Sequence, residues 1–485
     1  MIFGFLPMAV MLATTFLIPL VSLKTEKYII HTTLAGLFLS LLLSISMIPD
    51  VLSKGRVVYQ MEGWKAPFGI SIVFDPLSVF LSVAFIFIVL LAVVFSHKYI
   101  KYKKTEYYSL VCLVLVGTLG VINTGDIFNM FVYLEILSVS SYALTAFFKK
   151  KESLEAAIKY LIIGSLATSL VLLGIAFIYG VLGTLNMADI AVKISGTANP
   201  VIGTALALII TGMFIKSGLV PFHAWLPDAY QASPSPVTSI FSGVTTNVGM
   251  YAVLRLVFTV FNPVSVLLWM LMIVGAISML GGALLALVQN SLKRLLAYSS
   301  ISQMGFVAVS VGLGTQTGLS GGVLHIINHS IIKGLLFLCA GFIVYQTKTD
   351  NMHEISGKFK FNPVIGYSFI IGALSLVGVP LFNGFVSKWL IYVAAFQVSP
   401  VLTVLALVSS ALTLAYMLRA FYLVFLCNAK PGAKQKKIPL SMQLPLIVLV
   451  GIIILLGVFP GFSIDISNLM VQSLNKQQYI GAVLT

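Results

Sequence analysis

Apolar runs long enough to cross a lipid bilayer follow one another along almost the whole chain. A helix that crosses the hydrocarbon core needs about 20 apolar residues. Only 9% of the 485 residues are charged, whereas a soluble globular protein has about 25%. The chain therefore has the composition of a polytopic helical membrane protein, which excludes the soluble, disordered, collagen-like and nucleic-acid-binding classes.

Hydropathy predicts an all-α membrane fold of fourteen spans. They lie at about residues 3–23, 29–49, 76–96, 108–124, 127–147, 155–180, 200–220, 236–260, 264–289, 296–313, 319–346, 363–392, 401–427 and 441–460. The first run has no basic segment before it and no small-residue cleavage site, so we expect a span and not a removed signal peptide. The segment Asn123-Thr124-Gly125-Asp126 suits a tight turn between the fourth and fifth spans. Residues 50–75 are expected to form a small hairpin on the outer face.

The basic residues orient these spans, because cytoplasmic loops of membrane proteins carry an excess of Lys and Arg. The odd-numbered loops hold most of them: Lys24, Lys27, Lys98, Lys101, Lys103, Lys104, Lys149, Lys150, Lys151, Lys293, Arg294, Lys348, Lys358, Lys360, Lys430, Lys434, Lys436 and Lys437. The even-numbered loops and the C-terminal tail hold Lys54, Arg56, Lys65, Lys193 and Lys476. This asymmetry predicts a plasma-membrane protein with cytoplasmic odd-numbered loops and both termini outside. It also accounts for the net charge of +15 without a nucleic-acid partner.

The remaining basic residues fall inside spans: Lys159, Lys216, Arg255, Lys333, Lys388 and Arg419. Lys159 and Arg255 are expected to reach an interface with their long side chains. An ionisable residue at the bilayer centre costs roughly 3 kcal/mol on insertion scales. The deeper lysines, together with Glu135 near the middle of the fifth span, are therefore candidate functional residues. Each of them can also be structural, as a hydrogen-bonded core acid or as one partner of a salt bridge.

Lys216 precedes Pro221 by five residues inside a span. Proline breaks or kinks a helix, and broken membrane helices line wet cavities and mark ion sites. We therefore expect a broken helix at about residues 200–231. His223 and Asp228 lie at the break or beyond it, where they can line a cytoplasmic mouth or serve as ordinary interfacial caps.

His325, His329 and Lys333 fall at positions i, i+4 and i+8, so they share one helical face. Histidine can give and take protons near neutral pH. Two histidines four residues apart also suit a zinc pair, but no HExxH motif and no nearby cysteine accompanies them, so no metal is expected. A polar seam between helices is the structural alternative.

A second interrupted span, at about residues 363–392, contains Pro380, Asn383 and Lys388. Two interrupted lysine helices about 170 residues apart are what an inverted-topology repeat would produce. The predicted organisation places three spans in residues 1–107, two inverted five-helix repeats at 108–260 and 264–427, and the last span with its tail at 428–485.

A carboxylate, several lysines and a His–Lys seam at similar depth suit the movement of protons, because a buried lysine can lose and regain a proton. The chain has no GxxxxGK[ST] sequence, no GxGxxG sequence and no haem or iron–sulfur ligand set. We therefore expect no cofactor and no catalytic or redox centre in this chain.

Five longer stretches carry a resemblance to a known family: LEILSVSSYAL around Glu135, KSGLVPFHAWLPDAYQASPSPV from Lys216, KRLLAYSSISQMG from Lys293, HIINHSIIKGLLFL from His325 and GVPLFNGFVSKW up to Lys388. In these stretches the chain resembles the antiporter-like subunits shared by respiratory complex I, energy-converting membrane-bound hydrogenases and Mrp-type sodium/proton antiporters. MEGWKAPFGISIVFDPLSVFL, TGDIFNMFVYLE and GTLNMADI are similar to the D-type subunit of Mrp antiporters in particular.

The resemblance implies fourteen spans with broken seventh and twelfth helices, a Glu135–Lys216 pair, a central chain that includes His329 and Lys333, and a terminal Lys388. Many members of the family carry a lysine in the eighth span where this chain has Asn247, which cannot be charged. Either the proton relay passes through water held by Asn247, or the first half is coupled electrostatically without conducting.

The leading hypothesis is a proton-translocating subunit of a larger complex, with other membrane subunits, lipid and protons as its partners. Two hosts remain open. One is a sodium/proton antiporter, and the other is a membrane-bound hydrogenase or related reductase, in which the chain would be part of an oxidoreductase. A non-pumping structural subunit and a stand-alone transporter of an organic solute are the alternative hypotheses.

Overall fold

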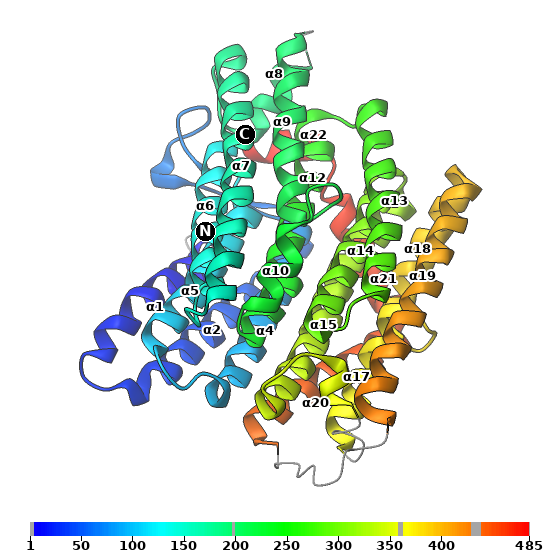
Figure 1. Ribbon diagram of the computed structural model, residues 1–485. Helices are drawn as coiled ribbons and strands as arrows, with labels where there is room; N and C mark the ends of the chain where they lie inside the picture. Colours follow the sequence, from blue (N-terminus) through cyan, green and yellow to red (C-terminus); the bar gives the residue numbers. More distant parts are fainter. Residues whose placement is uncertain (1–3, 196–198, 357–361, 428–437, 485) are drawn as a thin grey trace.

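The computed structural model describes residues 4–195, 199–356, 362–427 and 438–484. Nearly all regular structure in these residues is helical, and most helices run alongside one another in an elongated bundle (Figure 1). Twelve helical segments of this part are long and apolar enough to cross a membrane. They are η1–α3 (Glu26–Lys54), α4 (Pro76–Tyr99), α5 (Lys104–Asn123), α6 (Ile127–Thr145), α7 (Lys151–Leu182), α9 (Pro200–Ser217), α11–η4 (Ser235–Phe261), α13 (Ser265–Leu287), α14 (Leu292–Gly312), α15 (Gln316–Thr347), α19–η5 (Pro400–Leu426) and α20 (Leu440–Val458).

Two further apolar helices in the described residues are shorter, namely α1 (Leu6–Ser22) and α17 (Pro363–Val377). The remaining short helices are α8 (Met187–Ile194), α10 (Trp225–Ala232), α16 (Met352–Ile355), α18 (Asn383–Val398), α21 (Pro460–Gln472) and α22 (Lys476–Leu484). The first spanning segment contains α2 (Ile29–Ser46) and α3 (Ile48–Lys54). The segment α11–η4 contains α11 (Ser235–Ile240), the π-helical turn η3 (Phe241–Thr245), α12 (Thr246–Arg255) and the π-helical turn η4 (Leu256–Phe261).

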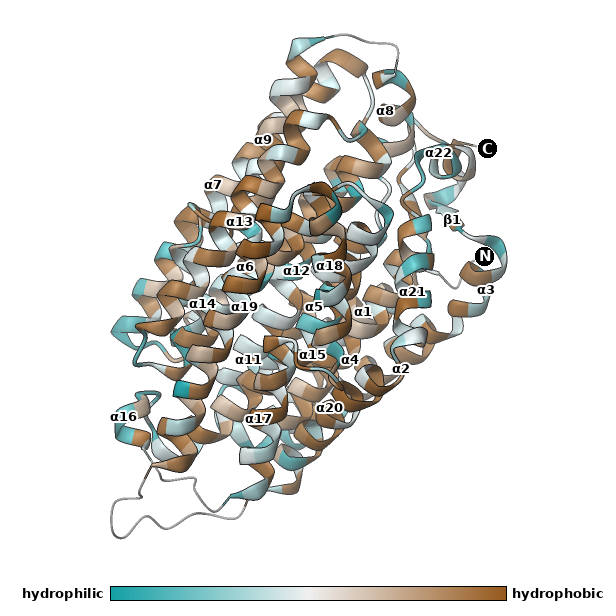
Figure 2. Cartoon of the chain, turned by 90° about the vertical axis from the view of Figure 1, so that its right-hand side faces the viewer, coloured by the Kyte–Doolittle hydropathy of each residue, from teal (hydrophilic) through white to brown (hydrophobic). Residues whose placement is uncertain are grey.

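Large apolar side chains cover the outside of the bundle. Leu161, Trp269 and Val404 are each about half exposed, on α7, α13 and α19. Hydrophobic residues follow the length of these helices, while hydrophilic residues gather toward the two ends (Figure 2). An apolar surface of this extent suits contact with lipid or with other membrane proteins. The fold is therefore that of a multi-pass membrane protein.

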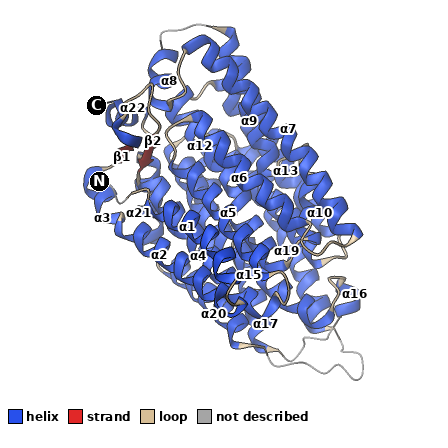
Figure 3. Cartoon of the chain, turned by 90° about the vertical axis from the view of Figure 1, so that its left-hand side faces the viewer, coloured by secondary structure: helices blue, strands red, loops and turns tan. Residues whose placement is uncertain are grey.

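Two local expectations are confirmed. The tight turn lies between Asn123, where α5 ends, and Ile127, where α6 begins, and the Asp126 side chain accepts a hydrogen bond from the Asn129 backbone N–H at 2.8 Å. The hairpin consists of β1 (Val57–Gln60) and β2 (Ser71–Phe74), which pair antiparallel with Val57 opposite Phe74. It lies at the same end of the bundle as α8, α22 and both termini (Figure 3).

Two helices are broken, as the sequence predicts, but glycine and not proline ends each first half. α9 ends at Ser217, and Gly218 follows with φ of 68°. α17 ends at Val377, and Gly378 follows with φ of 93°. A glycine at this position takes the left-handed conformation without a Cβ penalty. The chain then resumes as α10 after the first break and as α18 after the second.

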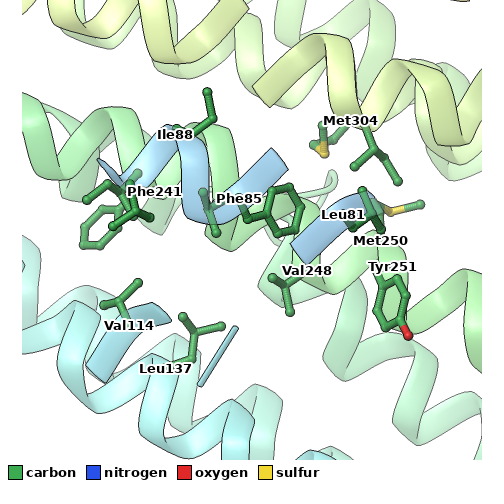
Figure 4. Packing of buried hydrophobic residues seen from close by; sticks show 14 of the residues in the cluster. Leu81, Phe85, Ile88, Val114, Leu137, Phe241, Val248, Met250, Tyr251 and Met304 are labelled. Carbon is green, nitrogen blue, oxygen red and sulfur yellow. The ribbon is translucent and has the colours of Figure 1, made fainter. Parts of the chain in front are cut away.

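The core of the bundle is built around α4, α14 and α15. Leu81, Phe85 and Ile88 of α4 lie among side chains from α5, α6, η3, α12 and α14 (Figure 4). Most residues of α14 and of α15 are buried. Because these two helices are enclosed by others, their polar side chains meet protein and not lipid.

The prediction that Arg255 reaches an interface is wrong, because it has a buried ionic partner. Arg255 is 4% exposed, and its guanidinium lies 2.7 Å from the carboxylate of Asp75, which also caps α4. Arg56 lies 3.8 Å from the same carboxylate. The ring of Tyr479 on α22 lies beside both guanidinium groups, and burial raises the pKa of its phenol, so the ring stays neutral. These residues, which we call the terminal clasp, fasten α22 to α4 and α12.

Another prediction on the basic residues is also corrected. Lys293, counted with the residues of the odd-numbered loops, is 4% exposed and donates hydrogen bonds inside the protein. Lys159 does reach the surface, where it pairs with Glu155 and Asp228. Six of the orienting residues lie outside the described part of the chain: Lys358, Lys360, Lys430, Lys434, Lys436 and Lys437.

Candidate functional site

The amine of Lys216 is buried among neutral oxygen atoms. Lys216 occupies the last turn of α9 and is 8% exposed. Its Nζ donates to Ser138 Oγ at 2.6 Å, to the Gly164 carbonyl at 3.1 Å and to Tyr142 Oη at 3.4 Å. The amine therefore joins α9 to α6 and α7, and its partners carry no charge.

The predicted pair of Glu135 and Lys216 is not closed in the structure. Both residues are described, and neither a hydrogen bond nor an ion pair joins them. Glu135 is half-buried on α6, one turn before Ser138, which holds the amine instead. Ser138 is not among the site residues predicted from the sequence, although its position three residues after Glu135 places both on one face of α6.

His325, His329 and Lys333 are all fully buried on α15, as one polar face inside the protein. Nδ1 of His325 lies 2.9 Å from Ser387 Oγ, and Nε2 lies 3.0 Å from Gln303 Oε1. Lys333 donates to the Leu296 carbonyl at 2.9 Å and to Ser299 Oγ. These contacts connect α15 to α14 on one side and to α18 on the other.

His329 has no hydrogen-bond partner at either ring nitrogen among the described residues, although it is completely buried. Among the described residues, Oδ1 of Asn247 and Nε2 of Gln303 are also buried without a hydrogen-bond partner. Buried polar groups in proteins are nearly always hydrogen-bonded, either to protein or to water. These atoms therefore mark places inside the bundle where water would bind.

Lys388 also lies among neutral groups. It is 1% exposed on α18, and its Nζ donates to Ser410 Oγ at 3.1 Å and to the Val377 carbonyl at 3.2 Å. The amine lies 4.4 Å from the centre of the Phe306 ring. Val377 is the last residue of α17, so Lys388 reaches back across the break to the carboxyl end of the first half-helix.

Asn383 braces the second break. Its Nδ2 donates to Asn328 Oδ1 at 2.9 Å, and its Oδ1 accepts from Ser375 Oγ at 2.7 Å. Asn328 in turn donates to the Asn383 carbonyl at 2.7 Å and to Ser387 Oγ at 3.1 Å. Asn383 therefore holds α17, α18 and α15 together beside His325 and Lys388.

Asn247 lies where α12 contacts α15. Its Nδ2 donates to Ser330 Oγ at 2.9 Å, and Ser330 directly follows His329 on α15. Two residues further along α12, Gly249 packs against Ser217 Oγ so closely that a Cβ would not fit, and Ser217 directly follows Lys216. A short segment of α12 thus contacts both Ser217, next to Lys216, and Ser330, next to His329.

His223 and Asp228 lie after the first break. His223 is half-buried, and its ring centre is 6.4 Å from that of Tyr298. Asp228 on α10 pairs with Lys159 of α7 at 3.0 Å and with Arg294 of α14 at 2.5 Å. Among the described residues, neither side chain forms a hydrogen bond or an ion pair with Lys216, Lys333 or Lys388, and Asp228 lies in a charged region near one end of the bundle.

Fold and site together define a polytopic helical membrane protein with a line of buried lysines and histidines between two broken helices. A model of the family described as NADH:quinone oxidoreductase/Mrp antiporter, TM, matches residues 124–413. The chain belongs to this family and is a D-type antiporter-like membrane subunit.

Comparisons with individual proteins agree with this assignment. The chain is 36% identical to the N subunit of the NADH-quinone oxidoreductase of Desulforudis audaxviator, over 83% of this chain and 84% of that protein. It is 33% identical to the D subunit of the Na(+)/H(+) antiporter of Alkalihalophilus pseudofirmus, over 86% of each. A chain of the membrane-bound sulfane sulfur reductase, an archaeal respiratory membrane complex, superposes with a TM-score of 0.93 at 33% identity and covers 99% of each chain.

Proposed function

We propose that this protein translocates protons through Glu135, Lys216, His325, His329, Lys333 and Lys388 as one membrane subunit of a larger complex. One observation carries the proposal. The buried amines of Lys216, Lys333 and Lys388 are hydrogen-bonded to hydroxyl and carbonyl oxygens only, with no carboxylate partner among the described residues. A lysine with a carboxylate partner is fixed in its charged form, whereas a buried lysine among neutral groups can exchange its proton.

The proposed mechanism begins at the Glu135–Lys216 pair. When the pair is closed, the carboxylate holds the charge of the amine. When it is open, with the amine on Ser138 as in the structure, the free charge of Lys216 repels a proton along the bundle toward His329. Water bound at His329, Asn247 and Gln303 would carry that proton to Lys333, His325 and Lys388. Asn247 serves here as the neutral link that holds water between the halves.

The number of membrane spans and their arrangement in repeats are part of the same proposal. Twelve long apolar helices, together with α1 and the broken pair α17–α18, would make fourteen spans. The breaks after Ser217 and after Val377 support two inverted five-helix repeats, at residues 108–260 and 264–427. Residues 1–107 would precede these repeats and residues 428–485 would follow them.

The orientation is proposed from the basic residues. Odd-numbered loops would be cytoplasmic, with both termini outside the plasma membrane. The hairpin and α22 lie at the end of the bundle where both termini lie (Figure 3), and they would therefore face outward.

The host complex is either a sodium/proton antiporter or a respiratory reductase, because the relatives carry both kinds of name. In both hosts other membrane subunits would contact the exposed apolar faces, and sodium is a transported ion only in the first. We propose that the chain itself carries no cofactor and has no catalytic role. A non-pumping structural subunit is the second candidate, and the neutral Asn247 at the junction favours it.

Proton transport by membrane vesicles that contain the whole complex distinguishes a proton-translocating subunit from a non-pumping structural subunit. We expect Lys216→Ala and Lys388→Ala to abolish most of the transport while the complex still assembles. Lys54→Ala is the control, because this lysine is exposed and pairs only with Asp50 beside it. Unchanged transport by the double variant Lys216→Ala/Lys388→Ala would refute the proposal in favour of the structural role.

A further inference from the structure

A cavity of about 610 Å³ lies between the two halves of the bundle, at the end away from the hairpin. The lining residues come from α7 and α10 of the first half and from α14 and the end of α15 of the second half. We call this cavity the vestibule. Its position between the halves places it within reach of the polar residues of both.

The walls of the vestibule are charged and therefore wet. Four carboxylates line it, from Glu152, Glu155, Asp228 and Asp350, and several basic residues face them. Asp228 pairs with Arg294 and Lys159 across the cavity wall. Charged side chains of both signs in a space of this volume hold water, and their carboxylates can exchange protons with it.

The floor of the vestibule is formed by two buried residues. Lys293 is 4% exposed and Ser233 is 1% exposed. Nζ of Lys293 donates to the carbonyls of Ser233 at 2.5 Å and of Gln231 at 2.8 Å, which fixes the end of α10. The hydroxyl of Ser233 faces inward, and its Oγ lies 3.3 Å from Thr145 Oγ1 on α6.

A row of buried hydroxyl groups continues from Thr145 along α6. Thr145, Ser141 and Ser138 are spaced by four and three residues, so they lie on one face of the helix, and the row is about 10 Å long at 1.5 Å per residue. Each hydroxyl donates to a carbonyl one turn earlier on α6. The oxygen lone pairs therefore remain available to accept hydrogen bonds from water. The far end of the row is Ser138, which holds the amine of Lys216.

We propose that the vestibule is the proton-exchange chamber of this chain at that end of the membrane, and that the hydroxyl row Ser233–Thr145–Ser141–Ser138 connects it to Lys216. Water ordered along the row carries the proton between the chamber and the amine. Thr145 is the positioning residue of the row, since its hydroxyl connects α6 to Ser233 in the floor. This inference rests on the proposed function, because it assumes that Lys216 exchanges protons.

The test removes the hydroxyl of Thr145 and keeps the shape of the side chain. Thr145→Val keeps the volume of the side chain and deletes its oxygen. We expect proton transport by the intact complex in membrane vesicles to fall at least several-fold, and we expect Thr145→Ser to restore it. Thr118→Val is a matched control, because Thr118 is also buried in a spanning helix and donates to the carbonyl four residues earlier, at 2.8 Å.

The outcomes separate this inference from the proposed function. If Lys216→Ala abolishes transport while Thr145→Val leaves it equal to Thr118→Val, the route is wrong and the proposed function stands. If Lys216→Ala leaves transport intact, both fail. An equal loss in Thr145→Val and Thr145→Ser, or an equal loss in Thr118→Val, would also overturn the route, because the hydroxyl would then not be the cause.

Access to the chamber has a separate test. Ala232 lines the vestibule and is partly exposed, so Ala232→Cys should react with a charged, membrane-impermeant thiol reagent. We expect labelling from the side of the odd-numbered loops to reduce transport several-fold, because the adduct fills the chamber. Labelling without any loss of transport would contradict the role of the chamber in transport, and the absence of labelling would contradict its accessibility to water.

Discussion

At the scale of the residue, this protein buries lysines without burying their counter-charges. Lys333 is completely buried, and its amine meets a backbone carbonyl and a serine hydroxyl. Neutral oxygens recover only part of the hydration free energy that a buried ammonium loses. Among the described residues, Lys216, Lys293, Lys333 and Lys388 are all buried with neutral hydrogen-bond partners. Gaining or losing a proton at such an amine changes the local field strongly.

The contact between Ser138 and Lys216 gives a prediction at this scale. We expect Ser138→Ala to slow proton transport about tenfold, as follows if the lost hydrogen bond to the amine shifts the barrier by about 1.5 kcal/mol. The measurement is the initial rate of proton uptake by vesicles that contain the assembled complex. Ser140→Ala is the control, because Ser140 is buried two residues away and donates only to the Ile136 carbonyl. Equal rates for the two variants would show that the contact has no part in transport.

At the scale of the element, each broken helix has a buried lysine beside its break. Lys216 lies in the last turn of α9, and Lys388 reaches back to the carbonyl of Val377, where α17 ends. The last carbonyls of a helix have no partner within it and carry partial negative charge. The two lysines stand on opposite sides of their breaks in sequence. Lys388 donates to the helix-end carbonyl of Val377, whereas Lys216 donates to partners on α6 and α7.

The second break yields a prediction about the glycine beside Lys388. Gly378 has φ of 93°, and a Cβ there would lie 3.0 Å from Cδ of Lys388. We therefore expect Gly378→Ala to cost about 1–2 kcal/mol of stability through its backbone conformation, and to slow transport by displacing Lys388. Thermal unfolding of the detergent-solubilised complex and its proton transport after reconstitution would both be measured.

Gly366→Ala is the matched control for this change. Gly366 lies on α17 with ordinary helical geometry, and a Cβ there would lie 3.8 Å from the nearest side-chain atom of Phe425. Alanine is expected to be neutral or slightly stabilising at this site. A variant Gly378→Ala that behaves like Gly366→Ala would show that the left-handed glycine is dispensable.

At the scale of the whole molecule, the parts of the bundle are joined by different chemistry at different depths. At the end with the hairpin, the terminal clasp ties α22 to α4 and α12 through the buried pair of Asp75 and Arg255. In the middle, Asn247 and Ser330 join α12 to α15 by one neutral hydrogen bond. At the other end, Asp228 joins α10 to α14 through Arg294. Of these three links, the middle one lies beside the neighbours of Lys216 and His329.

The middle link predicts how the halves communicate. We expect Asn247→Leu and Ser330→Ala each to slow transport several-fold, because each removes a polar group that would hold water between the halves. If the two residues act as one link, the double variant will be no slower than the slower single variant, which is the signature of coupled residues. The double-mutant cycle is obtained from the transport rates, in vesicles, of the unmodified complex, the two single variants and the double variant. Multiplying effects would mean that Asn247 and Ser330 act independently.

The sequence by itself determined the class of protein, most of its helices and its candidate residues. Apolar runs fix the spanning helices because lipid leaves the backbone no partner outside its own helix. The cost of an ionisable group in lipid likewise singles out Glu135, Lys216, Lys333 and Lys388 from the rest of the chain.

The tertiary structure decided what each of these residues meets, since a partner from another helix leaves no local signal. The sequence predicts Lys293 in a loop and Arg255 at an interface, yet both are buried. Their partners, Ser233 and Asp75, come from elements far away in sequence. Ser138 takes the amine that the sequence assigns to Glu135. Spacing along a helix defines which residues share a face, but only the packing of helices against one another determines the atoms on the other side.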